Sequence, residues 1–225
     1  MMKDNIFKNY NMDFSQQVIV SESEESWVPS PSFGVNRIPL EREEAESGHT
    51  TSLVEYLPGT SFSEHSHPLG EEIFVLEGTF SDEFGDYPKG TYLRNPPHSK
   101  HSPFSRTGCK LFVKLNQFDE HDTERVVLDT NHQTWQQGHG KLEVMPLHRF
   151  KTEGVALVKW PKGEQFVKHT HYGGEEILVL QGEFIDEFGH YPKLTWIRNP
   201  HLSTHTPYVE KETIIFVKTG HILKG

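Results

Sequence analysis

Apolar residues occur in short runs between turn residues, a pattern typical of β-strands. The runs cover residues 51–57, 73–76 and 111–114 in the first half, and residues 155–160, 177–180 and 215–218 in the second. Gly and Pro follow several of them, as in Pro58-Gly59, and mark turns. No segment has the 3.6-residue apolar period of an amphipathic helix. The pattern therefore predicts an all-β fold.

The two halves of the chain repeat each other. Val18-Ile19-Val20 is followed by Trp27, and Val126-Val127-Leu128 by Trp135, 108 positions later. Each repeat of about 100 residues is long enough for a small domain. We expect an N-terminal extension over residues 1–14, one domain over 15–118 and a second over 119–225, with a polar linker near 116–124. The extension is either flexible or an arm that docks on a partner subunit.

A group of metal-ligand residue types lies within the first repeat. His65 and His67 alternate on one strand, so their side chains share a face. Glu71 follows a Pro-Leu-Gly turn that can return it beside them, and His101 comes later in the chain. Three imidazoles and one carboxylate suit a borderline divalent ion.

The same four residue types recur in the second repeat, each 104 positions later: His169, His171, Glu175 and His205. A single His-x-His pair usually lies on a solvent-exposed strand and binds nothing. That explanation does not account for four ligand positions that all recur at the same offset. We predict two divalent ions per chain. Zinc is the expected metal, bound by four protein ligands; iron, manganese or nickel would keep coordination positions open for substrate or dioxygen.

Other residues near the motif have weaker signals. Glu72 and Glu176 neighbour the ligands, but strand alternation turns them away. Structural packing and a role in lining a pocket both remain open for a group of aromatic and basic side chains: Phe62, Phe74, Tyr92, Arg94, Phe166, Trp196 and Arg198. The remaining histidines do not recur with the ligand pattern and are expected to be ordinary: His49, His98, His121, His132, His139, His148, His190, His201 and His221.

Composition limits the function classes. The net charge of −10 argues against nucleic-acid binding, which needs clustered Lys and Arg. No apolar run approaches the ~18 residues of a membrane span, and the N-terminus lacks a signal peptide, so we expect a cytoplasmic protein without membrane contacts. The single cysteine, Cys109, fits a reducing compartment and is expected to be a small buried hydrophobe.

These motifs resemble the cupin superfamily. The first cupin motif, G-x5-H-x-H-x3-4-E-x6-G, matches from Gly59 to Gly78 and again from Gly163 to Gly182. The second motif is matched through Pro96 and His101 and through Pro200 and His205, but several of its positions are changed: His98, Leu194 and Leu202 replace Gly, while Ser105 and Val209 replace Asn. The closer likeness, through Gly70-Glu71-Glu72, Asp82-Glu83-Phe84-Gly85 and Arg94-Asn95-Pro96, is to the ChrR-like cupins. The resemblance covers nearly the whole chain as two tandem copies, and implies a conical β-barrel with a metal inside each.

The ChrR-like group includes the cupin part of ChrR-type anti-sigma factors and dioxygenases that cleave small ketones and diketones. The resemblance therefore implies a metal-binding double cupin with a regulatory, sensing or small-molecule-binding role, or alternatively a non-haem dioxygenase. A purely structural metal is a third interpretation. The anti-sigma factors hold the sigma factor through a separate Cys-containing zinc domain, so we expect this chain not to bind one. A small-molecule ligand at the metal and a homodimer are the expected partners.

Overall fold

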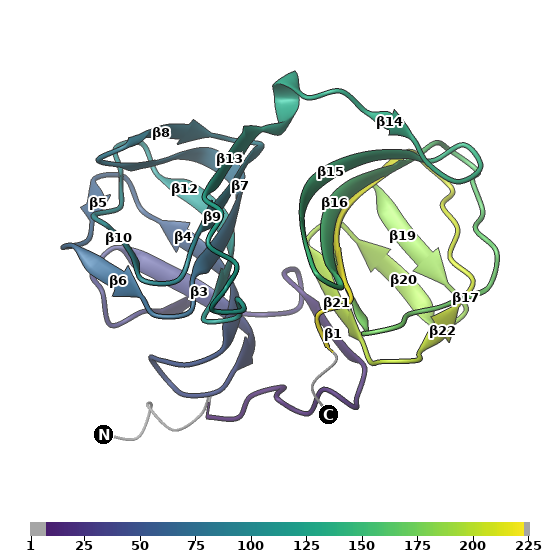
Figure 1. Cartoon of the computed structure of the whole chain (residues 1–225), viewed down its shortest axis with the longest axis horizontal. Coiled ribbons are helices and arrows are strands. Elements are labelled where there is room, and N and C mark those ends of the chain that lie inside the picture. The colour runs from purple at the N-terminus through teal and green to yellow at the C-terminus, as the bar shows by residue number, and fades with distance from the viewer. Residues whose placement is uncertain (1–7, 223–225) are drawn as a thin grey trace. The chain divides into compact units, whose positions relative to one another are not determined.

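The computed structural model describes residues 8–222, which form two compact units. Unit 1 comprises the described residues up to Met12 and Ser26–Gln133; unit 2 comprises Asp13–Glu25 and the described residues from Thr134 onward. Both are β-barrels (Figure 1), and the described residues include one short 3-10 helix and no α-helix. The all-β prediction is confirmed. Among these residues, no helix is long and apolar enough to cross a membrane.

Unit 1 contains twelve strands and the 3-10 helix. They are β2 (Val28–Pro29), β3 (Val35–Arg42), β4 (Thr50–Tyr56), β5 (Thr60–Ser61), β6 (His65–His67), β7 (Glu71–Asp82), β8 (Gly85–Pro88), β9 (Thr91–Asn95), β10 (Ser99–His101), β11 (Phe104–Ser105), β12 (Cys109–Leu115), β13 (Val126–Asp129) and η1 (Thr130–His132). The main sheet runs β13-β9-β7-β12-β4-β3-β2, with β5, β8 and β11 attached. Strands β10 and β6 form a separate antiparallel pair.

Unit 2 repeats this plan with eleven strands. They are β1 (Val18–Ser21), β14 (Gln136–Gln137), β15 (Glu143–Phe150), β16 (Glu153–Trp160), β17 (His169–Thr170), β18 (Glu175–Gln181), β19 (Glu183–Asp186), β20 (Gly189–Pro192), β21 (Thr195–Asn199), β22 (Thr204–His205) and β23 (Thr213–Thr219). The main sheet runs β1-β21-β18-β23-β16-β15-β14, and β17 pairs with β22 as β6 pairs with β10.

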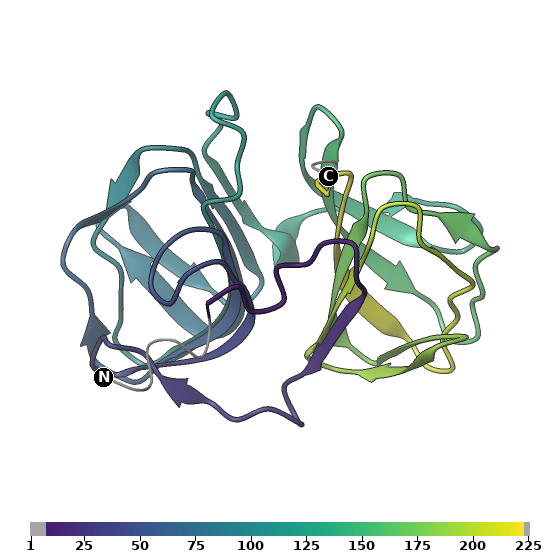
Figure 2. The same ribbon diagram turned by 90° about the horizontal axis from the view of Figure 1, so that it is seen from below.

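The first strand of each sequence repeat belongs to the other repeat's barrel. Strand β1 pairs with β21 of unit 2, and both views show it with the strands of that unit (Figures 1 and 2). Strand β13, which opens the second repeat, pairs with β9 of unit 1. The predicted boundaries at 15–118 and 119–225 follow the sequence repeat. In the compact units, by contrast, β1 belongs to unit 2 and β13 belongs to unit 1. Sequence similarity marks equivalent strands but not the sheet edge on which each strand pairs.

The described part of the N-terminal extension is held by hydrogen bonds. Tyr10 forms a β-bridge with Arg42, and the Asn11 side-chain amide donates to the Leu40 carbonyl oxygen at 2.7 Å, both within unit 1. In unit 2, the Arg198 guanidinium lies over the Phe14 ring and donates to the Asp13 carbonyl oxygen at 2.9 Å. Residues 8–14 are therefore bound to the barrels; the rest of the predicted extension lies outside the described residues.

Inward-facing residues of each barrel make its core. In unit 1, Ile73 and Val75 of β7 pack with Leu93, Leu111 and others, as alternation predicts. Cys109 is buried in the same cluster, so its predicted role as a small core residue is confirmed. Ile177 and Val179 occupy the equivalent places in unit 2.

The glycine positions of the second cupin motif keep their backbone conformation without glycine. His98, Leu194 and Leu202 have φ angles of 66°, 61° and 64°, in the left-handed region that glycine adopts without strain. The substitutions therefore preserve the turns that lead to His101 and His205, at a cost in local backbone energy.

Candidate metal centres

Strand pairing brings the predicted ligands of unit 1 together. In the β6–β10 pair, His65 lies opposite His101, and His67 shares the face of His65 two residues further along. Glu71 begins β7 after the tight turn at residues 68–70. Ligand atoms of His65, His67 and His101 all lie within 4.8 Å of one another.

The carboxylate and two of the imidazoles make the closest contacts. The Nε2 atoms of His67 and His101 are 3.0 Å apart, and Glu71 Oε2 lies 3.5 Å and 3.4 Å from them. Two nitrogens that share one ion through bonds of ~2.1 Å are separated by about 3.0 Å in octahedral and about 3.4 Å in tetrahedral coordination. The spacing therefore suits a single shared metal ion.

Unit 2 builds the same cluster from β17, β18 and β22. Ligand atoms of His169, His171, Glu175 and His205 all lie within 4.8 Å of one another. Glu175 Oε2 is 3.4 Å from His171 Nε2 and 3.7 Å from His205 Nε2. Both of these Nε2 atoms are buried without a hydrogen-bond partner in the described structure. Buried polar atoms are normally satisfied, so this pair fits a site that a metal ion completes.

The Nδ1 atoms of the first histidine in each cluster form hydrogen bonds with backbone carbonyl groups. His65 and His169 place Nδ1 at 3.1 Å and 3.0 Å from the carbonyl oxygens of Ser63 and Val167. A carbonyl can only accept, so Nδ1 carries the proton and Nε2 is the available ligand atom.

Two aspartates orient the last ligand of each cluster, and sequence reasoning missed this role. His101 Nδ1 lies 3.4 Å from Asp82 Oδ2, and His205 Nδ1 lies 3.1 Å from Asp186 Oδ2. Each aspartate is itself fixed, because its Oδ1 accepts from two backbone N–H groups and from the hydroxyl of Tyr87 or Tyr191. The available signal was Asp82-Glu83-Phe84-Gly85, which recurs at Asp186-Glu187-Phe188-Gly189 and which we used only as part of the resemblance to the ChrR-like cupins.

Two asparagines hold the ligand carboxylates. Asn95 donates to Glu71 Oε2 at 3.0 Å, and Asn199 donates to Glu175 Oε2 at 3.1 Å. In unit 2, the Gln17 side-chain amide in turn positions Asn199, because it donates to Asn199 Oδ1 at 2.7 Å. The repeated Arg-Asn-Pro sequence was the available signal for this function.

Burial and neighbouring charges shift the pKa values of the residues in each cluster in different directions. Burial, together with the charges of His205 and His169, lowers the pKa of His171 to about 3, which favours the neutral form that binds metal. Burial also lowers the pKa of His67, and it raises the pKa of Glu175 to about 7. For His205, burial acts downward, but the Asp186 hydrogen bond and the Glu175 charge outweigh it and raise the pKa.

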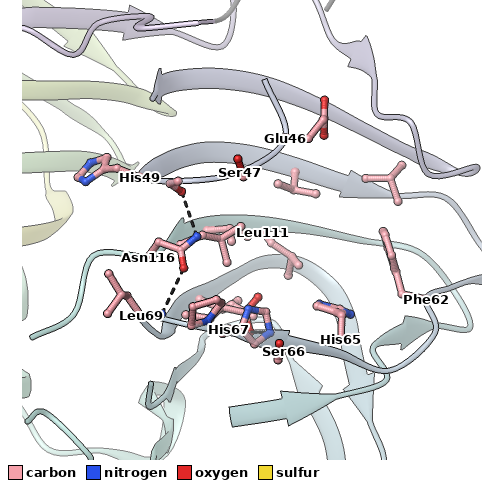
Figure 3. A pocket seen from close by; sticks show the side chains of 18 of the residues that line it. Glu46, Ser47, His49, Phe62, His65, Ser66, His67, Leu69, Leu111 and Asn116 are labelled. Atoms are coloured by element: carbon pink, nitrogen blue, oxygen red, sulfur yellow. Dashed lines mark hydrogen bonds and ion pairs between the residues drawn. The ribbon is translucent and has the colours of Figure 1, made fainter. Parts of the chain in front are cut away.

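A cavity of about 630 Å³ lies beside the unit 1 cluster, with His65, His67 and Glu71 in its wall. Most of the wall is apolar, and includes Val54, Phe62, Ile73, Phe80, Leu111 and Val113. Figure 3 shows His65 and His67 on one side and Glu46, Ser47 and His49 on the other. His49, which we expected to be ordinary, is thus a cavity residue.

Asn116 joins two loops at the edge of this cavity. Its amide donates to the Gly48 carbonyl oxygen at 3.0 Å, and its Oδ1 accepts from the Leu69 N–H at 3.2 Å (Figure 3). The loop between β3 and β4 is also held by the Arg37–Glu46 ion pair. In unit 2, a cavity of about 270 Å³ lies beside His171 and His205, and its other lining residues, such as Gln17 and Phe188, are not the equivalents of those that line the unit 1 cavity.

Several candidate residues lie away from the metal clusters. Glu72 accepts hydrogen bonds from Tyr92 at 2.5 Å and from Arg94 at 3.0 Å, on the other face of its strand, as alternation predicts. Trp196 and Arg198 are fully buried on β21. Of the predicted aromatic lining, Phe62 faces the unit 1 cavity and Phe166 packs on His169, with 4.8 Å between ring centroids.

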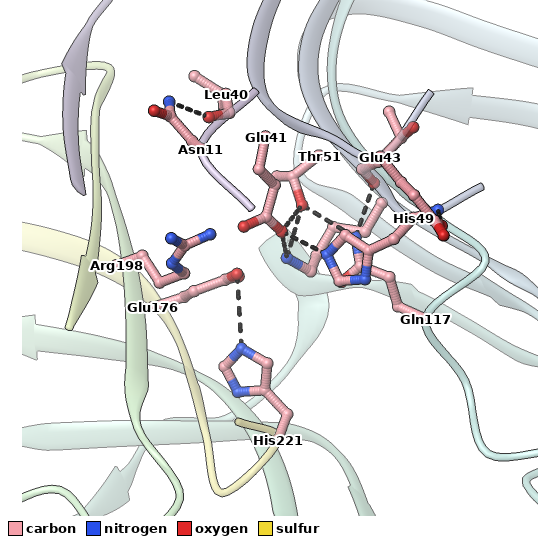
Figure 4. A network of polar contacts seen from close by, with 12 residues as sticks. Asn11, Leu40, Glu41, Glu43, His49, Thr51, Gln117, Glu176, Arg198 and His221 are labelled. Atoms are coloured by element: carbon pink, nitrogen blue, oxygen red, sulfur yellow. Dashed lines mark hydrogen bonds and ion pairs between the residues drawn. The ribbon is translucent and has the colours of Figure 1, made fainter. Parts of the chain in front are cut away.

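Buried polar networks account for other charged residues (Figure 4). In unit 1, Glu41 accepts from Thr51 at 2.7 Å and contacts His49 Nε2 at 2.7 Å, while Gln117 donates to Thr51 at 2.9 Å. In unit 2, Glu176 lies 3.4 Å from His221 Nε2. Among the described residues, none of the nine other histidines belongs to either metal cluster.

Two β-barrels, each with a three-histidine cluster and a buried glutamate, define a double-cupin protein. The family model of the ChrR cupin-like domain matches residues 15–119 and again 123–223, so the chain belongs to this family as two tandem copies. The curated proteins contain no match to the chain.

Solved structures show the same fold at low sequence identity. A protein of Nostoc punctiforme described as a "putative dioxygenase" is 17% identical, with a TM-score of 0.78 over 94% of this chain and 85% of that one. Escherichia coli Ylba is 13% identical, with a TM-score of 0.70 over 92% of each chain. The pirin YhhW of Escherichia coli, in complex with nickel(II), is 12% identical, with a TM-score of 0.67 over 91% of this chain and 98% of that one.

Proposed function

We propose that unit 1 binds a divalent metal ion and, in the adjacent cavity, a small and mainly apolar molecule that coordinates the ion. His65, His67, Glu71 and His101 would hold the metal. The observation that carries the proposal is that three of these residues, His65, His67 and Glu71, form part of the wall of the 630 Å³ cavity. Pockets of this size, mostly apolar with a few convergent polar groups, are typical of small-molecule sites.

Unit 2 would hold a second ion through His169, His171, Glu175 and His205. We assign small-molecule binding to unit 1, because the 630 Å³ cavity lies beside its ligands, and a structural or regulatory ion to unit 2. Zinc remains the expected metal, with iron, manganese and nickel as alternatives that would keep open positions. The function is then regulatory or sensing, with the small molecule as the signal.

The test combines elemental analysis with calorimetry. Protein purified without added metal should contain two ions per chain. The nickel-loaded protein should bind benzohydroxamate, a small aromatic metal chelator, and His65→Ala should abolish this binding. The matched variant His169→Ala should retain it. Loss of binding in His169→Ala alone would assign the ligand to unit 2, and no binding to the fully loaded protein would contradict the proposal.

A second candidate is a dioxygenase that cleaves a small ketone or β-diketone. The apolar cavity favours it, because such a site can shield a reactive intermediate from water. The fold likeness to a protein described as a "putative dioxygenase" points the same way. Fe²⁺-loaded protein would be mixed with β-diketones and hydroxyacetophenones while dioxygen uptake is followed. Substrate-dependent uptake that disappears in His67→Ala would establish this activity; no uptake, with zinc in the native protein, would exclude it for these substrates.

We also propose a cytoplasmic protein, with a homodimer as the expected assembly and without a sigma-factor partner. This sequence contains one Cys, so it does not itself supply the cysteines of the zinc site expected to hold a sigma factor. Affinity purification from the native host is the test. Recovery of a stoichiometric sigma factor would contradict the proposal.

A further inference from the structure

Tyr56 and Trp160 occupy equivalent places in the two barrels. Tyr56 ends β4 and pairs with Cys109, while Trp160 ends β16 and pairs with Thr213. Each ring packs between two phenylalanines. The ring centroid of Tyr56 lies 5.3 Å from Phe62 and 6.0 Å from Phe80.

These phenylalanines in turn contact the metal clusters. In unit 1, Phe62 lies 6.0 Å from His65 and Phe80 lies 6.1 Å from His101, measured between ring centroids. In unit 2, Trp160 packs on Phe166 and Phe184 at 6.1 Å and 5.5 Å. A phenylalanine ring therefore separates Tyr56, and likewise Trp160, from the imidazoles of its cluster.

Both side chains carry a hydrogen-bond donor that the described protein does not use. The Trp160 Nε1 atom is buried without a partner. Tyr56 is 9% exposed and lines the 630 Å³ cavity, and no residue in the described part of the chain hydrogen-bonds its hydroxyl group. Buried donors such as the indole N–H are normally paired, and the Tyr56 side chain lines the cavity, so a ligand or water there can bring an acceptor for its hydroxyl group.

The two side chains differ in size and in the donor they carry. Trp160 has the larger ring and belongs to the buried core cluster of unit 2. Tyr56 has a hydroxyl group and lines the 630 Å³ cavity of unit 1.

The charge of the cavity wall limits the ligand. Among the described residues, the lining of the unit 1 cavity includes no Lys or Arg, but it includes Glu43 and Glu46. A dicarboxylate would find no lining Lys or Arg to pair with, and the Glu43 carboxylate would repel it. The wall therefore favours an uncharged, apolar skeleton.

We propose that Tyr56 selects the ligand of unit 1, by donating its hydroxyl hydrogen to a second oxygen of a molecule whose first oxygen binds the metal. Trp160, at the equivalent position of unit 2, has a larger ring and no hydroxyl group. The ligand class is then an uncharged aromatic or branched aliphatic skeleton with oxygens at two separate positions. This inference rests on the proposed function of unit 1.

The test uses matched ligands and matched variants. Benzohydroxamate binds metal through the hydroxamate group, and its ring carries no oxygen. Its 3-hydroxy and 4-hydroxy analogues carry one hydroxyl group on the ring. Calorimetry on the nickel-loaded protein should show that Tyr56→Phe weakens at least one hydroxylated analogue about five- to tenfold, as for the loss of one hydrogen bond, and leaves benzohydroxamate unchanged. Tyr56→Trp should abolish binding of all three compounds while both metal ions stay bound.

Trp160→Phe is the control, and should change neither ligand affinity nor the metal content of unit 1. If Tyr56→Phe weakens all three ligands equally, or none of them, the assigned role of the hydroxyl is wrong even though the cavity binds ligand. If no compound binds the loaded wild-type protein, the proposed function fails and this inference fails with it.

Discussion

His205 Nδ1 lies 3.1 Å from Asp186 Oδ2, and both side chains are buried. Asp82 and His101 form the same pair in unit 1 at 3.4 Å. A carboxylate on Nδ1 fixes the tautomer that presents Nε2 to a metal, and it makes the imidazole a better donor ligand. We therefore expect the metal affinity of each barrel to depend on an aspartate that is not itself a predicted ligand.

Asp186→Asn should lower the metal affinity of unit 2 about 10–100-fold, the usual effect of losing such a partner. The barrel should stay folded, because the remaining oxygen can still accept from the Phe188 and Gly189 N–H groups. Chelator competition on His65→Ala protein, in which unit 2 is the remaining site, measures this directly. Glu187→Gln changes the exposed neighbour and is the control; equal affinities in both variants would refute the role of Asp186.

His101→Ala should empty unit 1 and leave unit 2 loaded, so that elemental analysis gives one ion per chain instead of two. The two clusters are built from separate strands in separate units, so they should lose metal independently. His121→Ala removes an exposed imidazole whose side chain is 74% exposed, and should keep both ions. Loss of both ions in His101→Ala would show that the sites are coupled.

Metal affinity of unit 2 should fall as the pH is lowered from 8 to 6. Burial raises the pKa of Glu175 to about 7, and the pKa of His205 is also raised above its ordinary value, so both groups gain protons in this range when no metal is bound. His171 stays neutral because its pKa is about 3. Metal must displace the added protons, which costs about tenfold in affinity per pH unit for each proton.

Calorimetric titration of His65→Ala protein at several pH values, in two buffers with different ionisation enthalpies, would count the released protons. An affinity that does not change between pH 8 and pH 6 would rule out this assignment of protonation states.

Leu202→Gly should stabilise the protein by about 0.5–1 kcal/mol. Leu202 has a φ of 64°, which strains a residue with a Cβ atom, and its side chain is 54% exposed, so little packing is lost. Leu194→Gly is the contrasting variant: φ is 61° there, but the residue is only 8% exposed, and loss of its packing should destabilise the protein. Thermal unfolding of both variants compares the two effects, and a lower midpoint for Leu202→Gly would contradict the strain argument.

Much of this architecture is encoded locally. Alternation along the strands places His65 and His67 on one face, and the repeat at 104 positions identifies His169, His171, Glu175 and His205 as their equivalents. The same alternation correctly turns Glu72 away from the metal cluster. These predictions succeed because the direction of a side chain on a strand depends only on its neighbours in sequence.

Contacts between distant residues were decided by the tertiary structure. The pairing of β1 with β21 joins residues about 180 positions apart, and no local pattern specifies that edge. Asp82 and Asp186 become partners of the ligand histidines only when the hairpins fold against the β10 and β22 strands. The cavity beside Tyr56 likewise depends on how several strands and the β3–β4 loop enclose a volume, and periodicity along one strand carries no information about the space between strands.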